Sequence, residues 1–346
     1  MSPINSGTLI GYGSVGHHHS QVLSARYEQM AIVDVSPKVC AQAKLDYPHA
    51  TVATSLDELE AAGWDWSKSV VVIASWGTSH SADFARLVEL GARHVVCEKP
   101  MADSVERAAR MIELAEDNHV LLGHHLQRRY NGLVPGVRAL AERFALGKPY
   151  SMFVQGGAAG IITNGIHYVD FATALFGESP QRVMSTAYGE QLNPRSKDLQ
   201  LYGGSSVWSF SSDRELAVSF NNRSSLAPLT TIYYRNAFMR MAQDFVVRLH
   251  KRDEEEVERF PAVTRTGAAQ ETVYEGLVEG ALDPQAATGR LLDEVEGSTP
   301  QTFRSGSALE VLGACIGALE SGRTGSAVAL PIDPSCDLGK RSWPIS

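Results

Sequence analysis

Three glycines near the start of the chain have the spacing of a phosphate-binding turn, Gly11-Tyr-Gly13-Ser-Val-Gly16. In such a turn the first glycine permits a tight bend, the second lets the backbone approach a pyrophosphate, and the third lets a helix pack against the preceding strand. The helix that follows presents unpaired N–H groups and the positive end of its dipole to the phosphates. We therefore predict that Gly11, Gly13, Ser14, Val15 and Gly16 bind a dinucleotide, because the turn follows a predicted strand and opens a predicted helix. A glycine-rich turn without a ligand is the alternative.

A carboxylate, Asp34, ends the next predicted strand. At this position a carboxylate accepts hydrogen bonds from the adenosine ribose diol and repels a 2′-phosphate. No arginine follows it, although Lys38 lies close enough in the sequence to offer a positive charge. The pattern favours NAD(H) over NADP(H).

Short apolar runs alternate with helical patterns over residues 8–123. The expected strands are Thr8–Ile10, Met30–Val35, Thr51–Ala53, Ser69–Ala74, His94–Cys97 and Val120–Leu122. Most of these runs are continuously apolar, as in strands with helices on both faces. Strands alternating with helices predict an α/β Rossmann domain, a doubly wound parallel sheet with right-handed crossovers, over residues 1–126.

Four polar residues follow two of these strands directly. Ser75 and His80 come after the fourth predicted strand, and Glu98 and Lys99 come after the fifth. Open α/β sheets bind ligands at the carboxyl ends of their strands, so these residues are candidates for a site. Each also has an ordinary interpretation, since a histidine can cap or pack its helix and a loop lysine is usually exposed.

Together with the glycine turn, these segments resemble the glucose–fructose oxidoreductase / inositol dehydrogenase family of NAD(P)-dependent sugar dehydrogenases. The resemblance continues through Gln127-Arg128-Arg129-Tyr130-Asn131 and Gly165-Ile-His167-Tyr-Val-Asp170, and it covers roughly residues 8–180 closely. It implies that Lys99 reaches toward nicotinamide and substrate, and that the bond between Lys99 and Pro100 is cis.

The resemblance also implies the members of the site. Lys99 and His167 are the expected catalytic residues. The expected cofactor contacts beyond the turn and Asp34 are Ser75, His80, Glu98 and Lys99. The expected substrate contacts are Arg128, Thr163, Asn164, His167 and Asp170.

His167 and Asp170 stand three residues apart at the start of a predicted helix over residues 165–177. A helix N-terminus disfavours imidazolium, which helps to keep His167 neutral and able to accept a proton. Neither this pair nor the run His17-His18-His19 predicts a metal site. The pair lacks a third ligand nearby, and consecutive helical residues point in different directions.

One position departs from the resembled family. Many relatives have an aspartate four residues before the histidine, where this chain has Thr163. Threonine carries no charge, so Thr163 and Asn164 are expected to hydrogen-bond a substrate hydroxyl instead.

Beyond residue 126 the pattern changes to alternation. Val207–Ser211, Glu215–Asn221 and Thr230–Tyr234 are expected strands of an open, mostly antiparallel sheet in an α+β domain over residues 127–330. In the resembled family such a sheet forms a dimer face, so a homodimer or homotetramer is expected. Residues 236–249 are expected to form a helix, and the charged residues 251–259 a solvated end.

The last part of the chain has two expected features. An apolar helix over residues 306–321 is expected to pack back onto the first domain. Residues 331–346, with three prolines and little periodicity, are expected to form an extended tail.

Composition narrows the class of protein. The 346 residues carry a formal net charge of −8, which argues against nucleic acid or anionic lipid as a partner. No signal-like or membrane-spanning segment is apparent, and four widely spaced cysteines suit a reducing compartment, so a cytoplasmic protein is expected.

The leading functional hypothesis is an NAD-dependent oxidoreductase acting on a hydroxyl or ketone of a sugar, cyclitol or sugar nucleotide. Two alternatives share the architecture. One is a glycosidase that oxidises and re-reduces its sugar with bound NAD, and the other is a non-catalytic regulator that binds NAD or a sugar.

Overall fold

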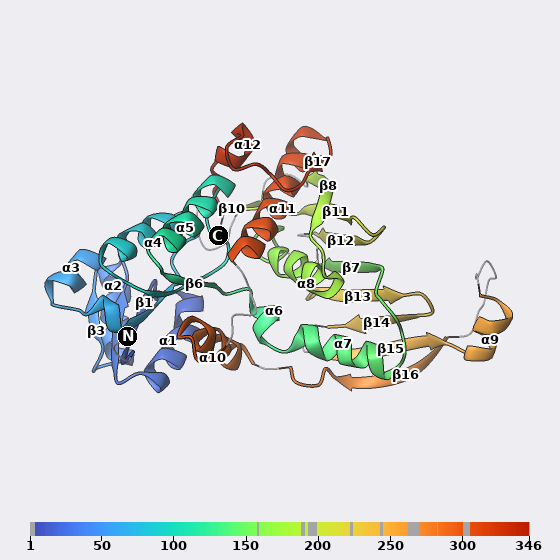
Figure 1. The fold of residues 1–346 in the computed structure, drawn as a ribbon, viewed down its shortest axis with the longest axis horizontal. Helices are drawn as coiled ribbons and strands as arrows, with labels where there is room; N and C mark the ends of the chain where they lie inside the picture. Colours follow the sequence, from blue (N-terminus) through green and yellow to red (C-terminus); the bar gives the residue numbers. More distant parts are fainter. Residues whose placement is uncertain are drawn as a thin grey trace.

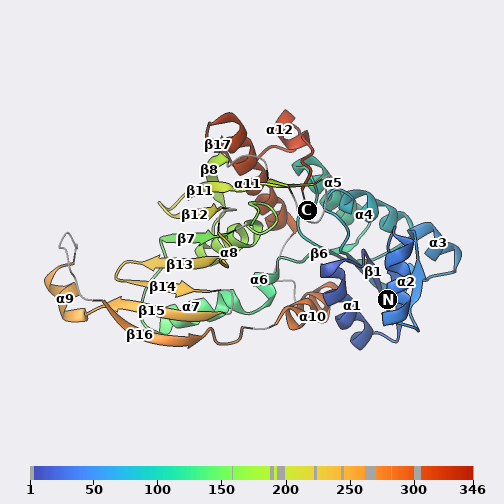
Figure 2. The same cartoon turned by 180° about the vertical axis from the view of Figure 1, so that it is seen from behind.

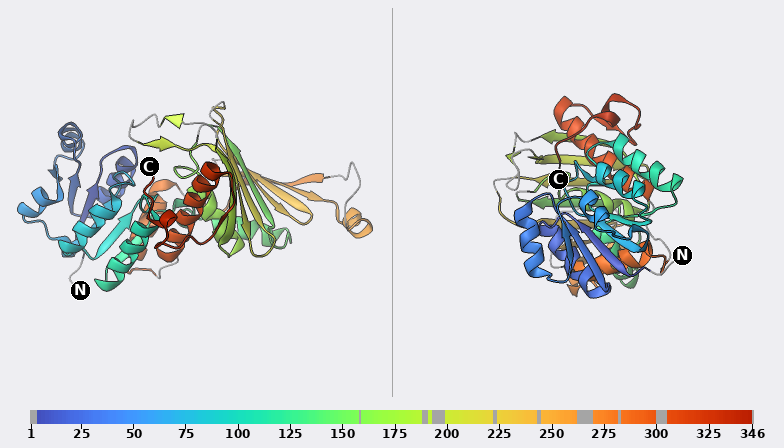
Figure 3. Two further views of the ribbon diagram at one scale, coloured as in Figure 1. Left: turned by 90° about the horizontal axis from the view of Figure 1, so that it is seen from above. Right: turned by 90° about the vertical axis from the view of Figure 1, so that its left-hand side faces the viewer.

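The computed structural model describes residues 4–157, 159–187, 191–192, 199–221, 224–242, 245–261, 270–281, 283–299 and 305–345. Two large sheets lie side by side along the long axis of the molecule, the first built from the N-terminal third of the chain (Figure 1). Helix α11 lies between them (Figure 3, left). No helix of the described ranges is both long and apolar enough to cross a membrane.

The first sheet is parallel throughout, with the strand order β3-β2-β1-β4-β5-β6. Its strands are β1 (Ser6–Ile10), β2 (Gln29–Val33), β3 (Thr51–Ala53), β4 (Ser69–Ile73), β5 (His94–Cys97) and β6 (Leu121–His124). The helices between them are α1 (Ser14–Arg26), α2 (Pro37–Asp46), α3 (Leu56–Ala61), α4 (His80–Glu89) and α5 (Val105–Asp117), with a short 3-10 turn at Trp66–Lys68. All six predicted strands and the Rossmann topology are confirmed. The strand order reverses between β1 and β4, so the crevice for a ligand opens beside the glycine turn.

The second sheet is mixed, in the order β16-β15-β14-β13-β7-β12-β11-β8-β17, and only its β7–β12 pair is parallel. Its strands are β7 (Ser151–Gly156), β8 (Pro180–Ala187), β11 (Gly204–Phe210), β12 (Glu215–Phe220), β13 (Leu229–Tyr234), β14 (Ala237–Met241), β15 (Val246–Arg252), β16 (Gln270–Leu277) and β17 (Val328–Ala329). β9 (Gln191–Leu192) and β10 (Gln200–Leu201) form a separate pair.

Helices cover one face of this second sheet. α8 (Ile166–Phe176) and α11 (Ser305–Thr324) pack on it, and the buried Trp208 indole donates to Ala314 O at 3.0 Å. α7 (Leu133–Arg143) packs against α8, and α9 (Glu254–Arg259) has no buried residue. The alternating burial of β11, β12 and β13 leaves the opposite face open, as the sequence pattern predicts.

The prediction of a helix over residues 236–249 is wrong. β14 and β15 lie there and pair antiparallel with each other. In β14 the burial alternates, with Met239 and Met241 inside and Arg240 outside. This alternation places one face of β14 in the core, and β14 also pairs with β13. Both effects favour a strand over the helix that the spacing of the apolar residues suggested.

Elements from the last part of the chain return to the first domain. α10 (Pro284–Val295), which the sequence assigned to the second domain, packs beside α1 (Figure 2) and lies so close to β6 that a Cβ on Gly123 would clash with Val295. α11 contacts α5 as predicted.

The C-terminal segment is not simply an extended tail, which corrects the prediction. It contains the helical turn α12 (Asp337–Lys340), and its Trp343 and Ile345 are buried. Trp343 N donates to Asp103 O of the first domain, while Pro344 O accepts from Gln200 N of the second. The segment therefore ties the two domains together.

Candidate active site

The glycine turn after β1 has the geometry that its sequence predicts. Gly11 has a φ of +89°, and a Cβ there would lie 2.7 Å from Ala74 O. A Cβ on Gly16 would press against Gly11 O, within van der Waals contact distance. At Gly13, by contrast, a Cβ would meet no described atom within 4 Å. Gly11 and Gly16 are thus required by the turn itself, whereas Gly13 borders open space.

The N-terminus of α1 is open to an anion. Within the described part of the chain no side chain caps it, and no acidic residue lies in its first turn. The N-termini of α3, α5 and α10 are instead capped by Ser55, Ser104 and Asp283. Free N–H groups at a helix start attract a phosphate, so this site fits the pyrophosphate of a dinucleotide.

Asp34 is held beside this turn at the end of β2. Its Oδ2 accepts from Tyr12 N and its Oδ1 from Ser36 N, both at 2.9 Å. Each oxygen keeps a second lone pair for an outside donor, and the residue is half-buried. The carboxylate is therefore oriented as a ribose contact requires.

The loop after β4 is stabilised from within. The Ser75 hydroxyl donates to Asp83 Oδ2 at 2.7 Å, at the start of α4. His80 is fully buried, and its ring nitrogens face Pro100 O at 2.9 Å and Ser75 O at 3.0 Å. Burial lowers the pKa of His80. The buried His80 side chain is thus placed to hold the loop against Pro100, and its predicted contact with the cofactor stays a prediction.

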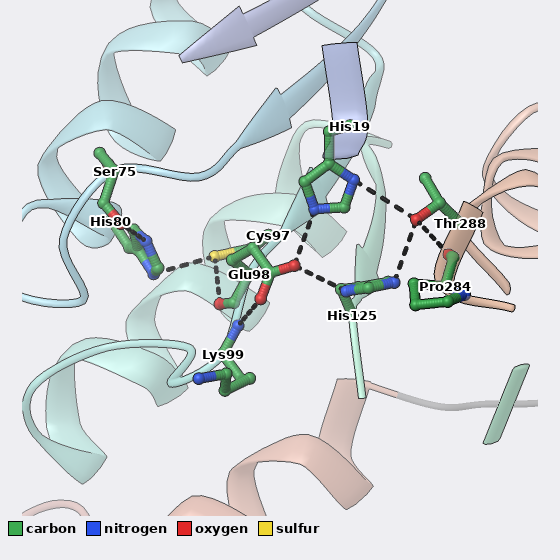
Figure 4. Close-up of polar contacts among 9 residues, drawn as sticks. All are labelled: His19, Ser75, His80, Cys97, Glu98, Lys99, His125, Pro284 and Thr288. Carbon is green, nitrogen blue, oxygen red and sulfur yellow. Dashed lines mark hydrogen bonds and ion pairs between the residues drawn. The ribbon is translucent and has the colours of Figure 1, made fainter. Parts of the chain in front are cut away.

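Glu98 lies in a buried cluster that joins three parts of the chain (Figure 4). His19 Nε2 and His125 Nδ1 both point at Glu98 Oε1, at 2.7 and 2.6 Å, and Lys99 N donates to Oε2 at 3.1 Å. Although burial raises the pKa of Glu98, the two imidazoles outweigh it and hold that pKa well below its usual range. An ionised carboxylate only accepts hydrogen bonds, so both imidazoles donate to it.

This cluster gives Glu98 a structural role. Both carboxylate oxygens are engaged inside the protein and the residue is 5% exposed, so Glu98 fixes the main chain at Lys99, and its predicted contact with the cofactor stays a prediction. His19 is the buried member of the histidine run His17-His18-His19. His125 and Thr288, whose hydroxyl lies 3.3 Å from His125 Nε2, were missed. His125 follows β6 at the ligand edge of the sheet, which is the signal that could have found it.

The same three residues also have the donor set of a metal site. Among the described residues, His19, Glu98 and His125 offer ligand atoms that all lie within 4.8 Å of one another. The two imidazole N–H groups are already used on one carboxylate oxygen, and all three side chains are sealed from solvent. We therefore assign the cluster a hydrogen-bonding role.

Lys99 bridges the two domains. It follows β5, and its Nζ donates to Thr163 O in the second domain at 2.9 Å. The Lys99–Pro100 bond is cis, as the resemblance implies. The contact uses the main chain of Thr163, so it does not depend on the side chain at that position.

A cavity of about 760 Å³ opens in the second domain beside this contact. Arg128, Asn164, His167 and Tyr168 line one side of it. The apolar side chains that line it elsewhere include Leu133, Leu226, Ala227, Pro228, Met241 and Phe245. Three of the predicted substrate residues thus meet at one cavity. Asn164 is also fixed by its own Oδ1, which accepts from Gly160 N.

His167 is neutral in this setting. Burial, followed by the positive charges of Lys99 and Arg128, holds the pKa of His167 well below its usual value. A neutral imidazole keeps a lone pair on one ring nitrogen, with which it can accept the proton of a bound hydroxyl.

Asp170 does not line the cavity, which corrects the expectation that it binds substrate. It is fully buried, and its Oδ1 accepts from Arg129 Nε at 2.7 Å. Burial raises the pKa of Asp170 to about 6 against the opposing effect of Arg129. The pair joins α6 (Gln127–Tyr130) to α8 and thereby holds the cavity wall.

Comparison with known proteins agrees with this geometry. Residues 7–125 match the model of an oxidoreductase family with an NAD-binding Rossmann fold, GFO_IDH_MocA. Over these residues the chain is similar to this family. The family match ends at residue 125, so it includes the glycine turn, Asp34, Glu98 and Lys99 but not the cavity.

Individual relatives extend the likeness. The chain is 30% identical over 147 residues to an inositol 2-dehydrogenase/D-chiro-inositol 3-dehydrogenase of Shouchella clausii, covering 41% of each chain. It is 27% identical over 212 residues to a D-apiose dehydrogenase of Rhizobium rhizogenes, covering 55% of this chain and 59% of that one. The matched part spans about half the length of such curated relatives.

The whole fold also has solved counterparts. GenD2 from gentamicin A biosynthesis, crystallised with NAD, superposes with a TM-score of 0.74 at 19% identity over 96% of this chain and 98% of its own. At this identity the likeness shows the shared fold of both domains.

Proposed function

We propose that this chain is an NAD-dependent oxidoreductase acting on a hydroxyl or ketone of a sugar, cyclitol or sugar nucleotide. The Lys99–Thr163 contact is the observation that carries the proposal. It holds the ammonium of Lys99, which follows a strand of the Rossmann sheet, against the second domain, where its charge acts on the neutral His167 of the cavity wall. The inositol and apiose dehydrogenases among its relatives support this substrate class.

The cofactor would be held by residues 11–16 and by Asp34. The uncapped start of α1 and the open space at Gly13 fit a pyrophosphate, and the oriented Asp34 carboxylate fits an unphosphorylated adenosine ribose. Ser75, in the loop after β4, lies at the same edge of the sheet. NAD, when bound, supplies a hydride acceptor, and NADH a hydride donor.

The chain's own residues manage one proton and one developing charge. As hydride leaves the substrate carbon, His167 accepts the proton of the hydroxyl on that carbon, and in reduction it returns the proton to the new alcohol. Lys99 donates a hydrogen bond to the same oxygen and stabilises its partial negative charge. Arg128 and Asn164 position the substrate, and Thr163 holds Lys99.

The open face of the second sheet supports a homodimer or homotetramer. Met184, Val207 and Phe153 are 45, 39 and 43% exposed there. Register aligns Val207 with Met184 on β8 and with Ala217 on β12, which in turn aligns with Phe153 on β7. A row of exposed apolar side chains across neighbouring strands is typical of a surface that another copy covers.

The test is a panel of sugars, inositols and nucleotide sugars with NAD or NADH, followed by NADH absorbance. With an active compound, Lys99→Ala and His167→Ala should each lower turnover by roughly 10²–10⁴-fold while NADH affinity stays unchanged. Lys148→Ala and His49→Ala, at exposed positions, are the matched controls.

Near-normal turnover in both site variants would remove these residues from the mechanism. Sugar release without net change in NADH would instead support the glycosidase alternative. NADH binding without turnover of any compound would support the regulator.

A further inference from the structure

The second-domain cavity contains a cation without a matching anion. Arg128 lines it, with its guanidinium 3.8 Å from the centre of the Tyr168 ring and 5.7 Å from that of Phe171. Arg128 Nη1 is buried, and no described residue accepts a hydrogen bond from it. The next residue, Arg129, shows the contrast, because Asp170 pairs with it directly.

This arrangement is energetically incomplete. A guanidinium taken out of water is stabilised only when anions or hydrogen-bond acceptors replace its hydration. Stacking on Tyr168 compensates in part, through the face of the ring. Burial lowers the pKa of Arg128, against the smaller opposing effects of Tyr168 and Asp170.

Two carboxylates of the described site pair directly with residues other than Arg128, although the charge of Asp170 still acts on Arg128. Glu98 accepts from His19, His125 and the main chain of Lys99. Asp170 accepts from Arg129.

The other residues at the site add no anion. Position 163 is a neutral threonine where the resembled family commonly has an aspartate. Among the described residues that line the cavity, Arg128 therefore supplies a positive charge beside the neutral His167 and no residue supplies a negative one.

We propose that the substrate of this site carries an anionic group, a carboxylate or a phosphate, that binds the guanidinium of Arg128. The inference rests on the proposed oxidoreductase function and narrows its substrate class to acidic or phosphorylated sugars and cyclitols. The planar fork of an arginine pairs with two oxygens of either anion. Its position beside His167 on the cavity wall places the anion next to the reacting hydroxyl.

Calorimetric titration of the full chain, with and without NADH, tests this independently of turnover. The ligands are matched pairs, glucuronate against glucose, glucose 6-phosphate against glucose, and inositol phosphate against inositol. At least one anionic member should bind about 10- to 100-fold more tightly than its neutral partner. The uronate and the phosphates distinguish the two sources of negative charge.

The variant Arg128→Gln should remove this preference, so that the anionic and neutral members of each pair bind within about twofold of one another. Arg110→Gln, which removes an exposed arginine on α5, is the matched control and should keep the preference. If Arg128→Gln does not fold, Arg128→Lys keeps the charge without the fork and should lower the preference by about tenfold.

These experiments distinguish a failure of this inference from a failure of the proposed function. Anion preference that depends on Arg128, without hydride transfer, keeps the inference and overturns the oxidoreductase proposal. If no anionic ligand binds at least tenfold more tightly than its neutral partner, or if Arg128→Gln leaves the preference intact, the inference is wrong. In that case, turnover of neutral sugars by the wild-type protein would still support the oxidoreductase proposal.

Discussion

Replacing Gly13 by alanine should separate cofactor binding from folding in the glycine turn. Gly13 has φ −84° and ψ −164°, a backbone conformation open to alanine, and its added Cβ would meet no described atom within 4 Å. The substitution should therefore leave the fold intact, and reduced freedom of the unfolded chain should stabilise it by about 0.4–1 kcal/mol. The open space, however, is where the pyrophosphate approaches α1.

The expected effect of this substitution is weaker binding of NADH. A methyl group at Gly13 keeps the phosphates from the N–H groups of α1, so NADH affinity should fall at least about tenfold, or about 1.4 kcal/mol. Gly16→Ala gives the opposite comparison, because its Cβ presses against Gly11 O. That overpacking should destabilise the fold by about 1–3 kcal/mol, so lost binding there would accompany lost stability.

Fluorescence titration with NADH and thermal unfolding, measured on the same samples, give both quantities. Gly306→Ala, at an exposed helical glycine of α11 with no described atom within 4 Å of its Cβ, controls for the added methyl group. Wild-type NADH affinity in Gly13→Ala would refute the assignment of this turn to the pyrophosphate. A melting temperature of Gly13→Ala several degrees below that of the wild type would refute the conclusion that a Cβ fits at Gly13.

Four further changes test other parts of the molecule. Asp34→Ala should weaken NADH and relax discrimination against NADPH in the same titration, and a wild type that prefers NADPH would contradict this role. Burial raises the pKa of Asp170 to about 6 from 3.8, so the native state holds this proton more tightly than the unfolded chain. The contribution of Asp170 to the free energy of unfolding should therefore fall by up to about 3 kcal/mol between pH 4 and about pH 6.5. Urea unfolding at a series of pH values measures this fall, and Asp170→Asn should lack it. Phe153→Arg, on the open sheet face, should shift light-scattering mass toward the monomer, and an unchanged mass would exclude that face as the interface. Thr163→Asp should raise the Kd of anionic ligands about tenfold and spare neutral ones, whereas equal loss of both would indicate a steric effect.

The sequence predicts the Rossmann domain well because its signals are local. Each of its six strands is a short apolar run between helical patterns, and Gly11 and Gly16 are required by contacts within one turn. The segment over residues 236–249 was mispredicted because its structure depends on a distant partner. β14 is a strand through its pairing with β13 and β15, which no local pattern records.

The site divides in the same way. Lys99 and His167 were predicted from motifs at strand and helix ends, and the structure brings both to the domain junction. The cluster around Glu98 was not predicted, because His19 and His125 come from separate elements and meet at one carboxylate oxygen. The position of His125 directly after β6 was a signal, but nothing in the sequence indicated that His19 meets it at the same carboxylate.

The threonine at position 163 changes the charge of the site without changing its framework. Lys99 is anchored by the carbonyl oxygen of residue 163, and any side chain there would preserve that hydrogen bond. An aspartate at position 163 would add a negative charge near Lys99, and the threonine of this chain carries none. The positions of Lys99 and His167 therefore do not require the acid, but the buried Nη1 of Arg128 still has no acceptor among the described residues. An anionic substrate would supply this negative charge while Lys99 and His167 keep their positions. An aspartate at position 163 would repel such a substrate, whereas the neutral Thr163 does not.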